Sequence, residues 1–407
     1  MKYSIALLFL FLLNSCKQEP VKIVSIKDDV TFLSDDALEG RQTGTDGEKA
    51  AADYIAKRFE KLGLEAKGTN GYYQNFTFKP KTNPHQTVNY TVKDGDSTIT
   101  GTNVLGFLNN NADHTIVIGA HFDHLGYGAE GSLHRGEKAI HNGADDNASG
   151  VAVMLNLADK LKNKNTSNNY LFMAFSGEEM GLLGSNYFVK NATIDTQKIN
   201  YMINMDMVGR LKADSTLAVY GVGTSPILKQ TLNAHNSTFK LIQKESGIGP
   251  SDHTSFYNAD IPVLHFFTGQ HEDYHKPTDD FDKLNYEGMT TISNYIFEVI
   301  SDLDNNGKLP FRKTKNESEE TPRFKVGLGV IPDYMFDGKG MRIDGISEDK
   351  PAQKAGLQKG DIVIKLGDST VTDMMSYMKV LATFEAGDKT KVTVDRNGKA
   401  VEATIQF

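Results

Sequence analysis

The sequence predicts an α/β fold, in which a mostly parallel central sheet carries helices on both faces and is followed by a small β-rich domain. Segments of helical period alternate with three apolar runs that suit short strands: Thr115–Ala120, Tyr170–Phe175 and Tyr201–Met205. Strands that alternate with helices favour a parallel sheet covered on both faces. The length of 407 residues exceeds what one hydrophobic core usually holds, so two domains are expected.

The charge balance excludes one class of partner. The chain has 44 Lys and Arg residues against 52 Asp and Glu residues, for a net charge of -8, and it contains no basic block. Nucleic-acid binding needs a positive surface, so nucleic acid is not an expected partner. A hydrophobic content of 39% is sufficient for a core, and only the N-terminal run is suited to entering a membrane.

Residues 1–16 are typical of an export signal. Lys2 precedes an apolar run, Ile5–Leu13, that is too short to span a bilayer comfortably. The run ends in Leu-Asn-Ser-Cys, which resembles the lipobox of bacterial lipoproteins, and Cys16 is the only cysteine of the chain. We therefore expect lipidation of Cys16 and an exported bacterial lipoprotein anchored to a membrane, facing the periplasm or the cell surface. The alternative is an ordinary cleaved signal peptide with an incidental cysteine.

The segment before the central strands predicts a tether, a helix and edge strands. Residues 17–27 are expected to form a short tether. Thr45 and Glu48 have the spacing of a capping box, and Gly63 suits the C-terminal end of the helix that follows. Arg41, in a turn-rich segment, is expected to tie a loop to a helix end rather than to contact a substrate. The predicted edge strands are Tyr72–Phe78, Thr87–Val92 and Asn103–Leu108.

Each central strand ends in side chains that can bind metal or move protons. His121 follows the first strand, Glu178 and Glu179 follow the second, and Asp206 follows the third. Asp146 lies between the first two strands, in a loop that leads into a helical run. The carboxyl ends of parallel strands share one edge of the sheet, where ligands bind. We therefore expect these five side chains to converge.

The alternation of helices and strands continues to the end of the first domain, which is expected to span residues 28–305. Further strands are predicted at Leu217–Tyr220, Phe239–Gln243 and Ile261–Phe267, and helices at Val151–Leu161, Pro226–His235 and Glu287–Leu303. Residues 249–253 are expected to form a loop that enters a short helix.

The residue types at the carboxyl edge predict a metal centre. Asp, Glu and His without Cys form a nitrogen and oxygen ligand set that suits Zn²⁺, and another divalent first-row ion would also fit. Two ions explain the number of ligands better than one, with His121 and Glu179 on different ions and Asp146 bridging them. Two divalent ions and three carboxylate ligands, with Asp206 as the third, leave one positive charge. Asp123 is placed to orient the imidazole of His121.

Glu178 is expected to have a different task from its neighbour. Adjacent residues in a loop do not easily aim both carboxylates at one point, so Glu179 binds metal while Glu178 faces the substrate. A carboxylate in that position is a natural general base, which takes a proton from the attacking water and returns it to a leaving amine.

These motifs resemble those of the co-catalytic di-zinc exopeptidases of peptidase family M28, which include the bacterial leucyl aminopeptidases. The resemblance covers roughly residues 28–303. It rests on five motifs in family order: His121-Phe-Asp, Gly-Ala-Asp-Asp146-Asn-Ala-Ser-Gly, Ser-Gly-Glu-Glu179, Asn-Met-Asp206 and Tyr-His275. Segment Gln74–Asn111 is too short for the protease-associated insert that many members carry, so the filter on substrate size is left open.

Carried over to this sequence, the resemblance implies a zinc exopeptidase fold with two zinc ions. It places His121, Asp146 and Asp206 at one ion, and Asp146, Glu179 and His275 at the other. It also implies that Glu178 is the base, that Asp123 is the orienting residue, and that Asp145 supports a loop.

Several other histidines compete with His275 for the role of ligand. His253 is expected to form a hydrogen bond at a helix start, and His271 is expected to be a solvated loop residue. Loop or rim positions are expected for His124, His134 and His141.

Residues 322–407 resemble a PDZ domain and follow a polar linker at residues 306–321. The resemblance rests on the run Ala-Gly-Leu-x-x-Gly-Asp within Pro351–Leu366 and on the helical period of Thr372–Phe384. The loop Gly327-Leu328-Gly329-Val330 is expected to hold the carboxylate of a C-terminal peptide ligand that adds as a strand. The alternative is a degenerate PDZ domain that only packs on the first domain.

The predicted function is the zinc-dependent removal of N-terminal residues from peptides by an exported, membrane-tethered aminopeptidase. One alternative is a glutaminyl-cyclase-like transferase on the same fold, but its relatives use one zinc ion and lack the first metal histidine, which His121 supplies here. Another is a non-catalytic lipoprotein that binds peptides in the PDZ groove, and the complete ligand set beside Glu178 argues against it. The preferred N-terminal residue stays open, and without the resemblance the sequence does not separate an aminopeptidase from a carboxypeptidase.

Overall fold

A computed structural model describes most of the chain. The described residues are 24–80, 90–128, 130–162, 164, 167–315, 325–333, 336, 338–347 and 349–407. The predicted signal segment and its lipidation site Cys16 lie outside the described residues. Among the residues that are described, no helix combines the length and the apolar character needed to cross a membrane.

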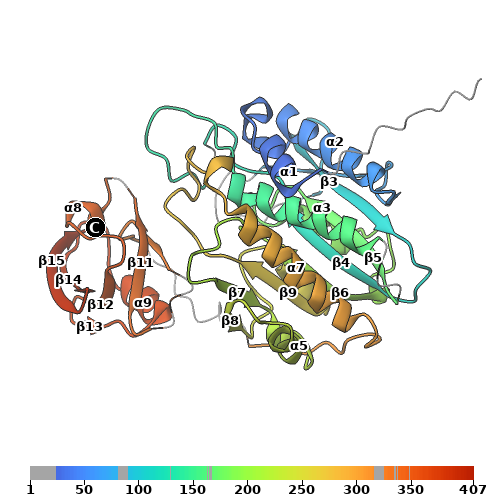
Figure 1. Cartoon of the computed structure of the whole chain (residues 1–407). Helices are drawn as coiled ribbons and strands as arrows, with labels where there is room; N and C mark the ends of the chain where they lie inside the picture. Colours follow the sequence, from blue (N-terminus) through green and yellow to red (C-terminus); the bar gives the residue numbers. More distant parts are fainter. Residues whose placement is uncertain are drawn as a thin grey trace, which may run out of the picture.

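The first domain is built on a mixed sheet of nine strands (Figure 1). The strands are β1 Glu65–Ala66, β2 Tyr73–Phe78, β3 Ile99–Leu108, β4 Thr115–His121, β5 Asn169–Phe175, β6 Ile199–Met205, β7 Thr216–Tyr220, β8 Lys240–Lys244 and β9 Val263–Phe267. Their order is β1-β3-β5-β4-β6-β9-β7-β8, with β2 paired to β3. The central strands β5, β4, β6 and β9 run parallel, and β3 and β7 flank them antiparallel. The predicted fold class is confirmed, with a parallel centre and antiparallel flanks.

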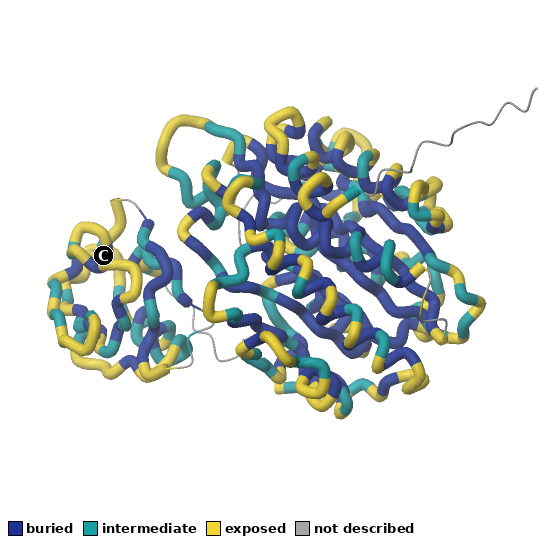
Figure 2. The backbone as a smooth tube through the Cα atoms, viewed as in Figure 1, coloured by how far each residue is buried: buried dark blue, intermediate teal, exposed yellow. Residues whose placement is uncertain are grey.

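The central strands are apolar along their whole length because they are covered on both faces. Every residue of β4, β5 and β6 is buried. A strand that is buried on both faces needs a continuous apolar run rather than an alternating one. Figure 2 shows these strands as the buried centre of the first domain.

Helices pack on the two faces of this sheet. They are α1 Ile26–Leu33, α2 Asp46–Lys61, α3 Gly150–Leu161, α4 Leu183–Lys190, α5 Leu228–Ala234, α6 His253–Tyr257 and α7 Tyr286–Leu303. One cluster of buried side chains joins α1, α2, α3, α5 and α7 to the sheet. A second, smaller cluster joins α4 and α6 to it. The sheet is therefore held from both sides, and its carboxyl edge is left for the site.

Helix α2 begins and ends at the residues that the sequence predicts, but its capping differs in part. The Thr45 hydroxyl accepts a hydrogen bond from the Glu48 backbone N–H, at 3.3 Å. The Glu48 carboxylate accepts instead from the backbone N–H groups of Gly44 (2.6 Å) and Thr102 (2.9 Å), so the reciprocal half of the capping box is not formed. Glu48 thus ties the helix to strand β3. Gly63 ends the helix in the left-handed region, with φ +77°.

The predicted strand Thr87–Val92 is wrong where it can be judged. Residues 81–89 lie outside the described residues, and residues 90–92 belong to no strand. Tyr90 is held through its side chain, whose hydroxyl donates to the Leu183 carbonyl at 2.8 Å and whose ring packs on Tyr187. Side-chain contacts therefore replace the expected ladder of backbone hydrogen bonds.

The described part of the predicted linker, residues 306–315, lies on the first domain rather than free of it. The Leu309 side chain is buried, and its backbone N–H donates to Asn200 Oδ1 at 2.7 Å. The Phe311 ring lies 5.4 Å from the ring of Tyr257, which belongs to α6. Because the segment is mostly polar, the sequence did not indicate that Leu309 and Phe311 pack on the first domain.

The second domain has its own antiparallel sheet and its own core. Its elements are β10 Val330–Pro332, β11 Met341–Ile346, α8 Pro351–Lys354, β12 Ile362–Leu366, β13 Ser369–Thr370, α9 Met374–Leu381, β14 Lys389–Arg396 and β15 Lys399–Gln406. The strand order is β10-β11-β12-β14-β15, with β13 paired to β12. One cluster of buried side chains fills this domain. The predicted β-rich second domain is confirmed.

Candidate active site

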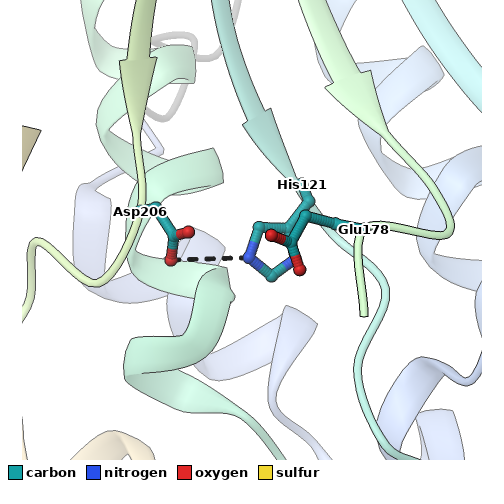
Figure 3. A group of neighbouring side chains, drawn as sticks. All are labelled: His121, Glu178 and Asp206. Atoms are coloured by element: carbon teal, nitrogen blue, oxygen red, sulfur yellow. Dashed lines mark ion pairs between the residues drawn. The ribbon is translucent and has the colours of Figure 1, made fainter. Parts of the chain in front are cut away.

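Three predicted site residues meet where the central strands end. His121 is the last residue of β4, Glu178 follows β5, and Asp206 follows β6. Because β4 pairs in parallel with both β5 and β6, these ends lie at one edge of the sheet. Figure 3 shows the three side chains around a common point, with His121 Nε2 at 3.5 Å from Asp206 Oδ1.

Asp146 joins this group to a second one. Its Oδ1 lies 3.3 Å from His121 Nε2, and its Oδ2 lies 3.2 Å from His275 Nε2. His275 Nε2 in turn lies 3.3 Å from Glu179 Oε2. The two oxygens of one buried carboxylate therefore face two different histidines, which is the arrangement that a bridging ligand needs.

His275 is held in place from outside the ligand group. Its Nδ1 lies 2.9 Å from the carbonyl oxygen of Gly131, which leaves Nε2 directed at the carboxylates. Its ring also stacks on the ring of Tyr274, with centroids 3.8 Å apart. Among the histidines considered as rivals, His253 and His271 have no such contact with both Asp146 and Glu179, so the choice of His275 agrees with the geometry.

His124 lies in a loop, as predicted, but it is buried inside the site rather than at its rim. Its Nδ1 is 2.8 Å from Glu179 Oε1, and the side chain is buried. The chain allows this close packing because Gly143 has no side chain, and a Cβ there would lie 2.6 Å from the His124 ring. The available signal was the spacing His121-x-x-His124 at a strand end. The other two loop histidines, His134 and His141, bond within their own loop as predicted.

Asp123 supports the site in a different way from the prediction. The His121 Nδ1 atom faces the backbone carbonyl oxygen of Asp123 at 3.2 Å, whereas the nearest carboxylate oxygen is 3.8 Å away. That carboxylate accepts from the Glu178 backbone N–H at 3.1 Å and from the Thr43 hydroxyl at 3.0 Å. Asp123 therefore orients the imidazole through its backbone and positions Glu178 through its side chain. Burial raises the pKa of Asp123 to about 6.

The loop that carries Asp146 is fixed by two further aspartates. Asp145 accepts from the Gly209 backbone N–H at 2.6 Å, which agrees with its predicted role in supporting a loop. Its other oxygen lies 3.1 Å from His271 Nε2. The prediction of a solvated His271 is therefore wrong, because this ion pair buries the ring. Asp279, which the sequence analysis missed, accepts from the backbone N–H of Asp146 at 3.1 Å.

His253 begins helix α6 but does not form the hydrogen bond expected there. Both of its ring nitrogens are buried without a hydrogen-bond partner among the described residues. Its ring stacks on that of His265, with centroids 4.4 Å apart and planes 4° from parallel. Burial lowers the pKa of His253 well below its ordinary value, so the ring packs as a neutral aromatic group.

Arg41 ties loops to the end of helix α1, in agreement with the prediction of a loop-to-helix contact, and these loops carry site residues. Its buried guanidinium donates to the carbonyls of Phe122 at 2.7 Å and Gly143 at 3.0 Å. It also donates to the carbonyls of Leu33 and Asn142. One side chain thus fixes the segments that carry His121 and Asp146, and burial lowers its pKa to about 10.

The adjacent carboxylates of Glu178 and Glu179 have opposite shifts in pKa. Burial raises the pKa of Glu178 well above its ordinary value. Burial and Asp146 act to raise the pKa of Glu179 as well, but His275 and His124 outweigh them and lower it to about 2. A pair of carboxyl groups separated in this way can divide proton transfer and ligand binding between them.

The donor set fits zinc. It consists of imidazole nitrogens and carboxylate oxygens, which are ordinary zinc ligands. Two groups of donor atoms each lie within 4.8 Å of one another: His121, Glu178 and Asp206, and His124, Asp146 and Glu179. In the second group, His124 faces Glu179 through its Nδ1 atom, at 2.8 Å from Oε1.

In the second domain, the predicted carboxylate loop precedes an edge strand. The carbonyl of Leu328 accepts from Ala352 N–H at 2.8 Å, and that of Gly329 accepts from Ser347 N–H at 2.9 Å. Gly329 has φ +76°, which turns the chain into β10. Within the described part of the domain, β10 pairs on one side only, with β11.

The fold is that of zinc exopeptidases. A zinc aminopeptidase from Bacillus subtilis matches with a TM-score of 0.54 at 18% identity, over 71% of this chain and 96% of that chain. A glutaminyl cyclase from Bacteroides thetaiotaomicron matches with a TM-score of 0.55 at 18% identity, over 68% of this chain and 97% of that chain. At such low identity the likeness shows the fold, which both proteins share.

Sequence comparison gives the family. Residues 103–300 match peptidase family M28, and residues 311–407 match the PDZ domain. The alkaline phosphatase isozyme conversion protein of Escherichia coli (strain K12) is 30% identical over 193 residues, which is 47% of this chain and 52% of that protein. Aminopeptidase YwaD of Bacillus subtilis (strain 168) is 29% identical over 181 residues, which is 41% of this chain and 39% of that protein. The chain thus spans about half or less of the length of these curated relatives. The chain therefore contains a peptidase family M28 domain at residues 103–300, followed by a PDZ domain at residues 311–407.

Proposed function

We propose that this protein is an aminopeptidase that uses two zinc ions to remove N-terminal residues from peptides. The observation that carries the proposal is the position of Asp146, whose two oxygens face His121 and His275 at 3.3 and 3.2 Å. A carboxylate with one histidine beside each of its oxygens can bridge two ions, each with its own histidine. The family and the relative named as an aminopeptidase support the reaction class.

Each zinc ion would have its own ligands besides the shared carboxylate of Asp146. His121 and Asp206 would complete one site, and Glu179 and His275 would complete the other. Zinc bound there would act as a Lewis acid that polarises the carbonyl of the scissile bond. The remaining steps depend on side chains of this chain.

Glu178 would move the proton. It is a buried carboxylate next to a proposed metal ligand, which is a suitable position for a general base. Its backbone is held by the Asp123 carboxylate, which fixes where it points. Glu178 would accept a proton from the attacking water and then deliver that proton to the nitrogen of the leaving amine.

We base the choice of a free N-terminus on the family and on the relative named as an aminopeptidase. The charge of the site is not the basis, because two zinc ions would offset the carboxylates of Asp146, Glu179 and Asp206.

Digestion of matched peptides tests this proposal. The purified zinc-loaded protein is incubated with one peptide that has a free N-terminus and with the same peptide acetylated, and the products are followed by mass spectrometry. We expect the free peptide to lose residues one at a time from its N-terminus and the acetylated peptide to persist. Ladders from the C-terminus, internal cuts, or pyroglutamate formation without hydrolysis would contradict the proposal.

We also propose that the protein is exported and anchored to a membrane by lipid on Cys16. The support is the sequence Leu-Asn-Ser-Cys after the short apolar run Ile5–Leu13. Cys16→Ser should move the protein from the membrane fraction to the soluble fraction of the cell envelope and leave its peptidase activity intact. A wild-type protein found wholly in the soluble fraction would contradict lipidation.

A peptide with a free C-terminus is the proposed ligand of the second domain. The unpaired side of β10 and the loop Gly327-Leu328-Gly329-Val330 before it support this proposal, because a peptide can add there as a strand. Fluorescence anisotropy with a library of labelled peptides tests it. Binding should be lost when the peptide C-terminus is amidated, and equal binding of acid and amide forms would contradict it.

A further inference from the structure

An ionic cluster joins the second domain to the first. Asp344, on strand β11, lies with Oδ2 at 2.9 Å from Lys212 Nζ and with Oδ1 at 3.5 Å from Lys359 Nζ. Lys359 also lies 3.8 Å from Glu272 Oε2. The two first-domain residues of this cluster, Lys212 and Glu272, are far apart in sequence. A single carboxylate of the second domain is therefore central to contacts with both segments.

The first-domain contacts fall on the loops that carry metal ligands. Lys212 lies six residues after Asp206, in the loop that follows β6, and Glu272 lies three residues before His275, in the loop that follows β9. Figure 1 shows the second domain on the side of the first domain where α3 and α7 begin. This is the side of the carboxyl edge, since α3 follows the loop of Asp146.

The same two loops are tied to each other. Arg210 Nη2 lies 3.0 Å from Asp273 Oδ2, and Lys283 Nζ lies 2.7 Å from Asp273 Oδ1. The segment after Asp206 and the segment before His275 thus form one ionic unit. The second domain is attached through Asp344 to this unit, whose two loops also carry Asp206 and His275.

The central ion pair of the attachment is partly shielded from water. The side chain of Asp344 is only 9% exposed, so water screens its pairing with Lys212 less than it screens exposed pairs. Lys359 and Glu272 are 53% and 66% exposed and contribute little. A contact of this kind holds a domain in place and still permits its release.

We propose that the second domain, seated through Asp344 on these loops, is the filter that limits substrates to short, unfolded peptides with a free N-terminus. The proposal rests on the aminopeptidase function proposed above. A flexible peptide end can pass beside the seated domain, whereas the body of a folded protein meets it before the N-terminus reaches His121.

Charge reversal at Lys212 tests whether the second domain is held through Asp344, and it changes no residue of the proposed active site. Lys212→Glu places a carboxylate against Asp344 and should release the second domain. Adding Asp344→Lys restores opposite charges and should seat the domain again. Lys244→Glu is the matched control, because it makes the same change of charge at the end of β8, on a strand that carries no site residue.

The readout is the ratio of two specificity constants. One substrate is a free peptide of about ten residues, and the other is the same sequence fused to the N-terminus of a stably folded protein through a linker of two residues. Wild type should strongly prefer the free peptide. Lys212→Glu should raise kcat/KM for the fusion relative to the peptide by about fivefold, as expected when an ion pair of roughly 1 kcal/mol is lost. The charge swap should restore the ratio of wild type, and Lys244→Glu should not change it.

Small-angle X-ray scattering provides a readout that does not depend on activity. The radius of gyration should increase for Lys212→Glu and return toward that of wild type in the charge swap. No increase for Lys212→Glu would show that the domain is not seated through this contact. Release without a change in the ratio, or a wild type that cleaves both substrates equally, would overturn the size filter. A wild type that cleaves neither substrate would instead contradict the aminopeptidase function.

Discussion

The position of Asp146 is the observation that best distinguishes a site for two metal ions from a site for one. Its two oxygens face different histidines, and its pKa is held well below its ordinary value because His121 and His275 outweigh the effect of burial. The neighbouring Asp145 has the same chemistry but faces a backbone N–H and His271. Position in the loop, rather than residue type, therefore decides which of the two aspartates can bind metal.

A protein that lacks the Asp146 carboxylate should bind neither zinc ion, whereas a protein that lacks the Asp206 carboxylate should still bind one. Asp146→Ala deletes a ligand shared by two sites, and Asp206→Ala deletes a ligand of the His121 site only. Elemental analysis of the purified variants should give close to no zinc per chain for the first and about one for the second. Asp145→Asn is the control for the loop and should retain two. Equal zinc loss in the two alanine variants would contradict a bridging role.

Glu178 should be needed for turnover and not for metal binding. Glu178→Gln keeps the size of the side chain and removes its ability to accept a proton. We expect kcat to fall by roughly 10²–10⁴, the usual contribution of a general base. Zinc content, measured on the same sample, should match that of wild type. If zinc were lost together with activity, Glu178 would be a ligand instead.

At the scale of single elements, most of the site followed from the sequence because strand ends place their residues. His121, Glu178 and Asp206 needed only three neighbouring parallel strands to meet. The buried positions of His124 and His271, which the sequence did not predict correctly, depend on contacts between loops. His124 enters the site because Gly143 leaves room for its ring, and His271 is buried because Asp145 pairs with it. The spacing His121-x-x-His124 was the one local signal for the first contact, and the pairing of Asp145 with His271 has no local signal in the sequence.

Helix α2 also connects to the site through a buried carboxylate. Glu48 accepts from the Ser176 hydroxyl at 2.6 Å, in addition to the backbone N–H groups of Gly44 and Thr102. Burial nevertheless raises its pKa from 4.5 to about 7. The helix is thus joined to β3 and to the end of β5 by a group that titrates near neutral pH.

This shift predicts how stability depends on pH. Between pH 4.5 and about 7 the folded state holds the Glu48 proton and the unfolded state releases it, so the contribution of Glu48 to the free energy of unfolding falls as pH rises. A shift of about 2.5 pKa units corresponds to about 3 kcal/mol. Chemical denaturation at pH 5 and pH 8 should show Glu48→Gln losing less stability than wild type over this range. Glu60→Gln, on the exposed side of the same helix, should behave as wild type does, and parallel curves for all three proteins would contradict the assignment.

At the scale of the whole molecule, the sequence predicted two domains of the right classes but not how they are connected. The polar composition of residues 306–315 indicated a linker, and the two apolar residues among them, Leu309 and Phe311, were too few to show a period. Their partners, Asn200 and Tyr257, lie more than fifty residues earlier in the chain. Likewise, the pairing of Lys212 with Asp344 joins residues 132 positions apart. Contacts at such separations become visible only when the fold brings them together.

Because residues 306–315 pack on the first domain, we predict that the stability of a truncated first domain depends on whether it includes them. A chain that ends at residue 315 keeps Leu309, Phe311 and the hydrogen bond from Thr314 N–H to the Tyr257 hydroxyl, at 2.9 Å. A chain that ends at residue 305 loses them and exposes the apolar surface that they cover. The burial of two such side chains contributes about 3 kcal/mol. For a domain of this size, that loss should lower Tm by on the order of 5–10 °C.

Calorimetry on the two truncated proteins checks this prediction, since both lack the second domain and differ only in residues 306–315. Leu309→Ala in the longer protein should reproduce part of the decrease, because its side chain is buried, whereas Lys313→Ala, at an exposed position of the same segment, should have little effect. Zinc content should be unchanged in all of them, since the segment lies away from the carboxyl edge of the sheet. Equal Tm values for the proteins ending at residues 305 and 315 would show that the segment is a free linker after all.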